Sequence, residues 1–125
     1  MAIAKKGRRR IVVGDREFLW WVRPDWDNHN APGVATVTVA TDDRRILLDY
    51  ALNQDEDSQH VTVLGPEFRG ESQNGPARRF RCPKFGLPGE IRPSHVAELI
   101  AWCTDPGPLP EPTDWRGHTI TAART

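Results

Sequence analysis

Two runs of strand-forming residues flank a two-residue Gly-Asp connection near the start of the chain, and this pattern constrains the fold most. The first run, 8–13, ends in Ile-Val-Val, and the second, 16–23, contains Phe-Leu-Trp-Trp-Val. The Gly14-Asp15 connection between them predicts a β-hairpin with a type II′ turn. The short loop also predicts the register, in which Val13 lies opposite Arg16, Ile11 opposite Phe18, Arg9 opposite Trp20 and Arg8 opposite Trp21.

The predicted register gives the hairpin two faces that both carry large apolar side chains. One face contains Ile11, Val13, Phe18, Trp20 and Val22. The other face contains Val12, Leu19 and Trp21 among Arg8, Arg10 and Glu17. A sheet covered by one helix buries one face, and its second face is normally polar. Either loops and the proline-rich tail cover Leu19 and Trp21, or the second face is open to a partner. Arg8 could also stack on Trp21 as a cation–π pair.

The remaining periodicity predicts an α+β domain. Four further strand-like runs lie at 34–41, 46–52, 60–64 and 78–82, so we expect a mostly antiparallel β-sheet or meander of five to six strands. Residues 65–77, rich in Gly, Pro, Glu and Ser, are predicted to be a loop. One C-terminal α-helix is predicted at 93–103, with Pro93 in its first turn or Ser94 as its N-cap. Its buried stripe would be Val96, Leu99, Ile100 and Cys103.

The chain of 125 residues has the length of one domain. We expect a flexible basic arm at 1–7, a single α+β domain at 8–104 and a proline-rich strap at 105–125, held to the domain by Leu109 and Trp115. No apolar run has the length of a signal peptide core or a membrane span. Two cysteines are too few for a disulfide framework of the secreted type. These features predict a cytoplasmic protein with reduced thiols and no membrane association.

No motif in the chain specifies a reaction, and the formal net charge is zero. Tryptophan and arginine are the residue types enriched at protein interfaces, and the first hairpin combines both. We therefore expect a small non-catalytic protein–protein interaction module or accessory subunit, whose partner is another protein or a second copy in a homodimer. The predicted contact residues are Arg8, Arg10, Leu19, Trp20, Trp21 and Trp26.

Nucleic-acid binding is the first alternative function. Two basic groups, with aromatic residues near the first, could neutralise phosphates and stack on bases. The first comprises Lys5, Lys6, Arg8, Arg9 and Arg10, and the second Arg78, Arg79, Arg81 and Lys84.

A small metal-dependent hydrolase is the second alternative, in which Asp25, Asp27 and His29 would act from the 24–33 loop. Their spacing matches no established metal site, so local turn capping explains them more simply. Cys82, His95, Cys103 and His118 form the most plausible zinc set, but they lack Cys-x-x-Cys or His-x-x-x-His pairs. Arg81 and Lys84 could lower the pKa of the Cys82 thiol, although no general base can be assigned. We predict no enzyme, no bound metal and no cofactor.

The residues from Arg9 to Trp21 combine an Arg-Arg-Ile-Val-Val start, a Gly-x turn and an aromatic-rich return strand. Together with the Pro-x-x-Val-x-x-x-Ile pattern that begins at Pro93, they resemble a family of small bacterial proteins without an assigned activity. The family's Gly-Trp-x-Pro segment after the helix is not matched, because Trp102 lies within the predicted helix and Trp115 follows the prolines. The resemblance covers the two ends of the chain. It implies a bacterial cytosolic source and a β-meander-plus-helix fold, and it implies no activity.

Overall fold

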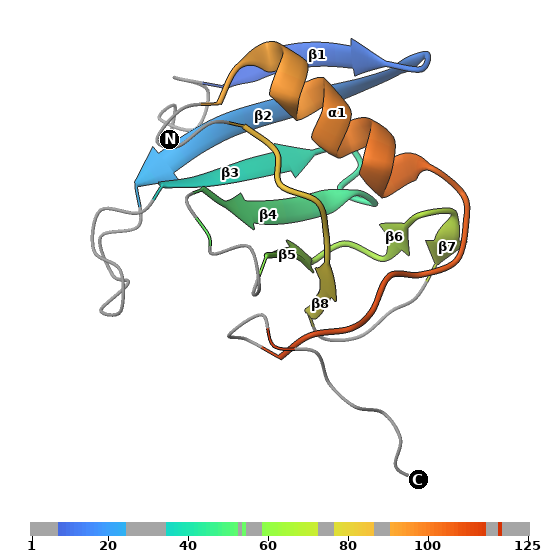
Figure 1. Cartoon of the computed structure of the whole chain (residues 1–125). Helices are drawn as coiled ribbons and strands as arrows, with labels where there is room; N and C mark the ends of the chain where they lie inside the picture. The colour runs from blue at the N-terminus through green and yellow to red at the C-terminus, as the bar shows by residue number, and fades with distance from the viewer. Residues whose placement is uncertain are drawn as a thin grey trace, which may run out of the picture.

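A six-stranded antiparallel sheet and a helix packed on it form the described part of the protein (Figure 1). The computed structural model describes residues 8–24, 35–52, 54, 59–72, 77–86, 91–114 and 118. The sheet order is β1-β2-β3-β4-β5-β8. The predicted α+β fold, a meander followed by a C-terminal helix, is confirmed. The bounds are Arg9–Val13 for β1, Arg16–Pro24 for β2, Ala35–Ala40 for β3, Leu47–Ala51 for β4, His60–Val63 for β5, Arg78–Arg81 for β8 and Pro93–Thr104 for α1.

The β1–β2 hairpin has the predicted register but a different turn. Val13 pairs with Arg16, and the pairing continues to Arg9 opposite Trp20. Gly14 and Asp15 have φ angles of +56° and +68°. A type II′ turn needs a positive φ only at its first central residue, whereas type I′ needs it at both. The type II′ prediction was therefore wrong, and the reason is that the Asp15 backbone adopts the left-handed region, which aspartate tolerates better than most residues.

The hydrophobic core lies between α1 and one face of the sheet. The predicted helical stripe of Val96, Leu99, Ile100 and Cys103 is buried, which confirms that prediction. Burial of each aliphatic side chain stabilises the fold by about 1.5–3 kcal/mol, and a helix of this length needs such packing to form. The sheet contributes Phe18, Trp20, Val37, Val39, Leu48, Tyr50, Val61, Val63 and Phe80 to the core.

The helix begins at Pro93, and its N-cap is Arg92 rather than the predicted Ser94. Proline is favoured at the first helical position, because its missing N–H would have no intrahelical partner there. The N-cap therefore precedes Pro93, and Ser94 lies inside the first turn. The backbone N–H of Arg92 donates to Nδ1 of His95 over 3.0 Å. This contact ties the residue before the helix to its first turn.

A second, smaller hairpin occupies part of the segment predicted as a loop. β6 (Glu67–Phe68) pairs with β7 (Glu71–Ser72), so the loop prediction was wrong for these residues. Arg69 in the turn donates from its backbone N–H to the carbonyl of Cys103 over 2.8 Å. Its Nη1 donates to the carbonyl of Trp102 over 2.7 Å. The small hairpin thus caps the C-terminal end of α1, where backbone carbonyls lack intrahelical partners.

The proline-rich segment after α1 runs along the outer edge of β8. The N–H of Arg81 donates to the carbonyl of Glu111 over 2.8 Å, and the N–H of Thr113 donates to that of Arg79 over 2.9 Å. Leu109 packs against the core, as expected. Trp115 lies outside the described residues. This end of the sheet is therefore covered by the chain itself.

Candidate functional site

The two edges of the sheet differ. The edge at β8 is paired with residues 111–113, whereas no described residue pairs with the outer edge of β1. Val13 and Arg16 flank the two-residue turn and so form a hydrogen-bonded pair. Hydrogen-bonded and non-hydrogen-bonded pairs alternate along an antiparallel ladder. The N–H and C=O groups of Arg10 and Val12 consequently point away from β2, and an edge of this kind can accept another strand.

The side chains of this edge combine charge with exposed apolar surface. Val12 is 67% exposed, more than Val22 or Leu64, the other large apolar side chains that are exposed among the described residues. On the same face, Arg10 forms an ion pair with Glu17. The guanidinium carbon of Arg8 lies 4.1 Å from the centroid of the Trp21 ring, which is the cation–π stack considered from the sequence. We call Arg8, Arg10, Val12, Leu19 and Trp21 the hairpin surface.

The structure separates the predicted partner-binding residues. Arg8, Arg10, Leu19 and Trp21 share the face opposite α1, and Leu19 and Trp21 are half-buried there. Trp20 is only 4% exposed and belongs to the core, so its side chain is not part of any accessible surface. Trp26 lies outside the described residues. Val12 was not among the predicted contact residues, although its position between Arg10 and the turn on the same face was a signal for it.

The middle of the face opposite α1 is closed rather than open. Thr36, Thr38 and Ala40 of β3 are 8%, 5% and 2% exposed. The hydroxyl of Thr38 donates to Oδ1 of Asp49 on β4 over 2.7 Å. The β3 part of this face is therefore closed, whereas Arg10, Val12 and Glu17 at the β1–β2 end are exposed.

The two basic groups predicted for nucleic-acid binding lie at opposite edges of the sheet. β1 and β8 are separated by four strands, which corresponds to about 24 Å at roughly 4.8 Å per strand spacing. Arg78 donates to the carbonyl of Gly65 over 3.0 Å. Lys5 and Lys6 lie outside the described residues. The described arginines Arg8, Arg9, Arg10, Arg79 and Arg81 therefore do not form one patch.

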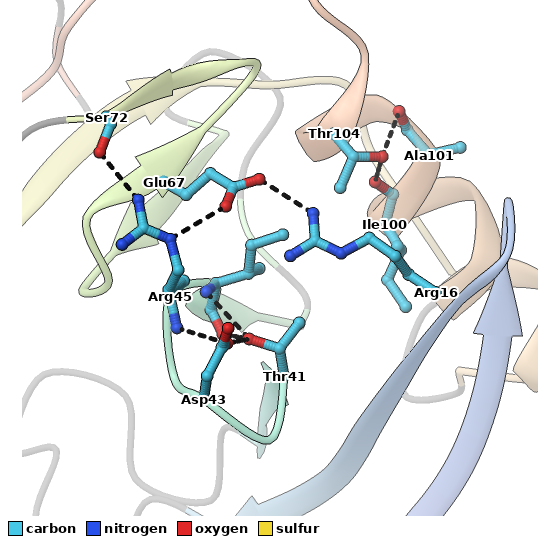
Figure 2. Close-up of polar contacts among 10 residues, drawn as sticks. Arg16, Thr41, Asp43, Arg45, Glu67, Ser72, Ile100, Ala101 and Thr104 are labelled. Atoms are coloured by element: carbon cyan, nitrogen blue, oxygen red, sulfur yellow. Dashed lines mark hydrogen bonds and ion pairs between the residues drawn. The ribbon is translucent and has the colours of Figure 1, made fainter.

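A charged cluster anchors the tip of the β1–β2 hairpin to the rest of the fold (Figure 2). Arg16 Nη1 donates to Oε2 of Glu67 over 2.9 Å, and Nε of Arg45 lies 3.5 Å from Oε1 of the same carboxylate. Arg45 also donates to the hydroxyl of Ser72 over 3.0 Å. Figure 2 shows Glu67 between the two guanidinium groups. The hairpin that carries the open edge is thus held at a defined position.

In the described part of the structure, clefts border the hairpin on two sides, and two of them are lined by hairpin residues. The larger, of about 620 Å³, lies between Val13, Arg16 and Phe18 of the hairpin and Ala101, Thr104 and Asp105 at the end of α1. The smaller, of about 280 Å³, is lined by Arg10, Glu17, Phe18, Leu19 and Asp42. Each cleft contains charged side chains beside apolar ones.

Both cysteine thiols are buried and stay protonated at neutral pH. Burial raises the pKa of the Cys82 thiol to about 12. The charge of Arg81 lowers this pKa, as the sequence allowed, but desolvation outweighs it. Burial also raises the pKa of Cys103 well above its usual range. In the described part of the chain, no group of three or more His, Cys, Asp and Glu residues is placed to hold a metal. Asp25, Asp27 and His29 lie outside it.

Among the described helices, none is both long and apolar enough to span a membrane. Comparison with known proteins finds no matching family model, no matching curated protein and no matching solved structure.

Proposed function

We propose that this chain is a small, non-catalytic protein-binding module that recognises its partner through the hairpin surface and the adjoining edge of β1. One observation carries the proposal. The fold covers one edge of its sheet with residues 111–113, while the outer edge of β1 pairs with no described residue. Exposed edge strands favour pairing with another chain, and proteins usually protect them.

The side chains beside this edge support the same function. The side chain of Val12 is an exposed apolar group that a partner can contact. Arg8 stacks on the Trp21 ring, and together they form a contact surface with a charged and an aromatic part. Buried apolar and aromatic contacts supply most of the affinity at protein interfaces, and arginine is enriched there. The Arg16–Glu67 ion pair holds the hairpin in place, which reduces the entropy lost on binding.

Nucleic-acid binding is the less favoured function, because the described basic groups lie at opposite edges of the sheet and the face between them is closed at β3. Phosphate-driven binding would weaken steeply with salt and survive single substitutions at the edge backbone.

Val12→Pro tests the proposal sharply. The Val12 N–H points away from β2, so proline removes a donor from the open edge without removing a β1–β2 hydrogen bond. Val12→Thr is the matched control, because it keeps the N–H and the β-branched shape. Wild-type, Val12→Pro, Val12→Thr and Trp21→Ala chains would be used as baits in nuclease-treated lysate at low and high salt, after urea unfolding has shown that each is folded.

A protein retained by the wild type and Val12→Thr at both salt concentrations, but lost with Val12→Pro and weakened with Trp21→Ala, supports the proposal. Equal retention by Val12→Pro contradicts it, as does recovery of nucleic acid alone. Unfolding of Trp21→Ala would instead assign that side chain to the core.

A further inference from the structure

We propose that the partner docks as an extended acidic segment, pairing along β1 as an added strand. This inference rests on the proposed function and names the chemistry of its partner. It follows from the backbone groups and the charges that the described part of the hairpin presents at one edge.

Two alternate residues of β1 have backbone groups that are available to another strand. The N–H and C=O groups of Arg10 and Val12 point outward, because Val13 and Ile11 use theirs to pair with Arg16 and Phe18. An extended segment can bond to both residues while its side chains alternate between the two faces of the sheet. Strand addition of this kind obtains affinity from main-chain hydrogen bonds and specificity from side chains.

The charges at this edge select an acidic occupant. Arg8 and Arg10 lie on the face opposite α1, and Arg9 lies on the face of α1, where its guanidinium carbon is 5.5 Å from the centroid of Trp20. Cations therefore flank the edge on both faces. Glu17 is the ion-pair partner of Arg10, but the side chains of this pair are 73% and 55% exposed and remain accessible to a second carboxylate.

The order of residues along β1 determines how a bound segment would be oriented. Arginines occupy its first half, and Ile11, Val12 and Val13 occupy its second half. A complementary segment therefore has acidic residues at one end and β-branched residues at the other. Carboxylates opposite the arginines would gain charge-assisted hydrogen bonds, while the apolar half would cover Val12.

A second copy fits this edge less well. Antiparallel self-pairing centred on Arg10 would place two Arg10 side chains opposite each other, which like-charge repulsion disfavours. Pairing centred on Ile11 would place Arg10 opposite Val12 and Arg9 opposite Val13, and the arginines would gain no acidic partner. Pairing centred on Val12 would place Arg10 opposite Gly14, which lies in the turn with a φ of +56°, so only three residues of each β1 would overlap. An acidic segment neutralises these charges, whereas a second copy doubles them.

The test uses two fluorescein-labelled peptides with capped ends, Thr-Val-Thr-Val-Glu-Asp-Glu-Glu and its reverse, which probe antiparallel and parallel addition. Their counterparts have lysine at every acidic position. Fluorescence anisotropy would compare the wild type with Val12→Pro, Val12→Thr and the charge-reversed Arg8→Glu/Arg9→Glu variant. Arg44→Glu/Arg79→Glu is the matched control, because it reverses two arginines that are not part of β1.

We expect at least one acidic peptide to bind the wild type and to lose about tenfold or more in affinity with Val12→Pro and with Arg8→Glu/Arg9→Glu. Arg44→Glu/Arg79→Glu should change affinity by less than about threefold. Val12→Thr keeps the outward N–H and loses only one methyl group from the apolar contact, so it should lose less affinity than Val12→Pro. The lysine peptide should bind the Arg8→Glu/Arg9→Glu variant better than it binds the wild type.

Two outcomes separate this inference from the proposed function. If acidic and lysine peptides bind the wild type equally and both lose affinity with Val12→Pro, β1 remains a docking edge and the acidic inference is overturned. If sedimentation shows a wild-type dimer that Val12→Pro converts to a monomer, the occupant is a second copy, which also overturns it. Acidic-peptide binding unchanged in Val12→Pro would overturn strand addition itself.

Discussion

Arg16, at the turn of the first hairpin, donates a 2.9 Å hydrogen bond to Glu67, which lies 51 residues further along the chain in β6. Arg45 approaches the other oxygen of the same carboxylate. One acidic side chain thus joins the β1–β2 hairpin, the segment between β3 and β4, and the small β6–β7 hairpin. This cluster sets the position of the edge that we assign to partner binding.

Glu67→Gln should lower the free energy of unfolding by about 1 kcal/mol, because two guanidinium groups lose one partly buried partner. The control is Glu17→Gln, which breaks an exposed pair with Arg10 and should change stability by less than about 0.5 kcal/mol. Urea unfolding of the three proteins makes the comparison. Equal effects of the two substitutions would show that the contacts of Glu67 with Arg16 and Arg45 do not stabilise the fold more than an exposed ion pair does.

Arg69→Met should destabilise the fold by about 1–2 kcal/mol, since it removes the side-chain donor to the Trp102 carbonyl at the C-terminal end of α1. It also removes the guanidinium whose central carbon lies 4.9 Å from the Trp102 ring centroid. Helical circular dichroism and urea midpoints would measure the loss. Arg44→Met, at an exposed position between β3 and β4, provides the comparison, and an equally large effect there would count against a specific cap.

Gly65→Ala should be more damaging than Gly14→Ala, although only Gly14 has a positive φ. An added Cβ at Gly65 would lie 2.5 Å from the carbonyl oxygen of Arg45 and 2.9 Å from the N of Leu47. At Gly14 it would meet nothing within 4 Å. We expect a loss of about 2–3 kcal/mol at Gly65 from the backbone clash and about 1 kcal/mol at Gly14 from the left-handed conformation. Thermal unfolding of both variants decides the order.

Stability should fall at alkaline pH because of buried groups that are neutral in the fold. The pKa of Cys82 rises from 9.0 to about 12 and that of Tyr50 from 10.0 to about 12, each mainly through burial. The unfolded chain therefore loses these protons at lower pH than the folded chain. Their stabilisation is complete below about pH 9 and declines as pH rises toward about 12.

Urea unfolding at about pH 8 and about pH 10.5 would measure this decline, and Cys82→Ala should reduce it. The same burial predicts that a thiol reagent labels neither cysteine in the native protein at about pH 8, and labels both after unfolding. Rapid native labelling of Cys82 would show that its thiol is ionised and accessible.

The sequence predicted those features that depend on neighbouring residues. The hairpin register follows from the length of the Gly14-Asp15 turn, and the separation of Trp20 from Trp21 onto opposite faces follows from strand alternation. The buried stripe of α1 follows from its helical spacing. The sequence did not predict the turn type. The turn type depends on the sign of φ at Asp15, and aspartate can adopt either a negative or a positive φ.

The features that the sequence could not predict depend on contacts between distant segments. β6 and β7 have two residues each, too few for an alternating pattern. The cap from Arg69 to Trp102 spans 33 residues. The open edge of β1 depends on strand order in the whole sheet, so the exposure of Val12 became evident only with the fold.

The most direct test of the binding account is amide hydrogen exchange along β1, measured by NMR on the free protein and with its captured partner. In the free protein, the N–H groups of Ile11 and Val13 should be protected by β2, and those of Arg10 and Val12 should exchange rapidly. Partner binding should slow exchange at Arg10 and Val12. Protection of these two amides in the free protein, at any concentration, would contradict an open edge, and unchanged rapid exchange in the complex would contradict docking at β1.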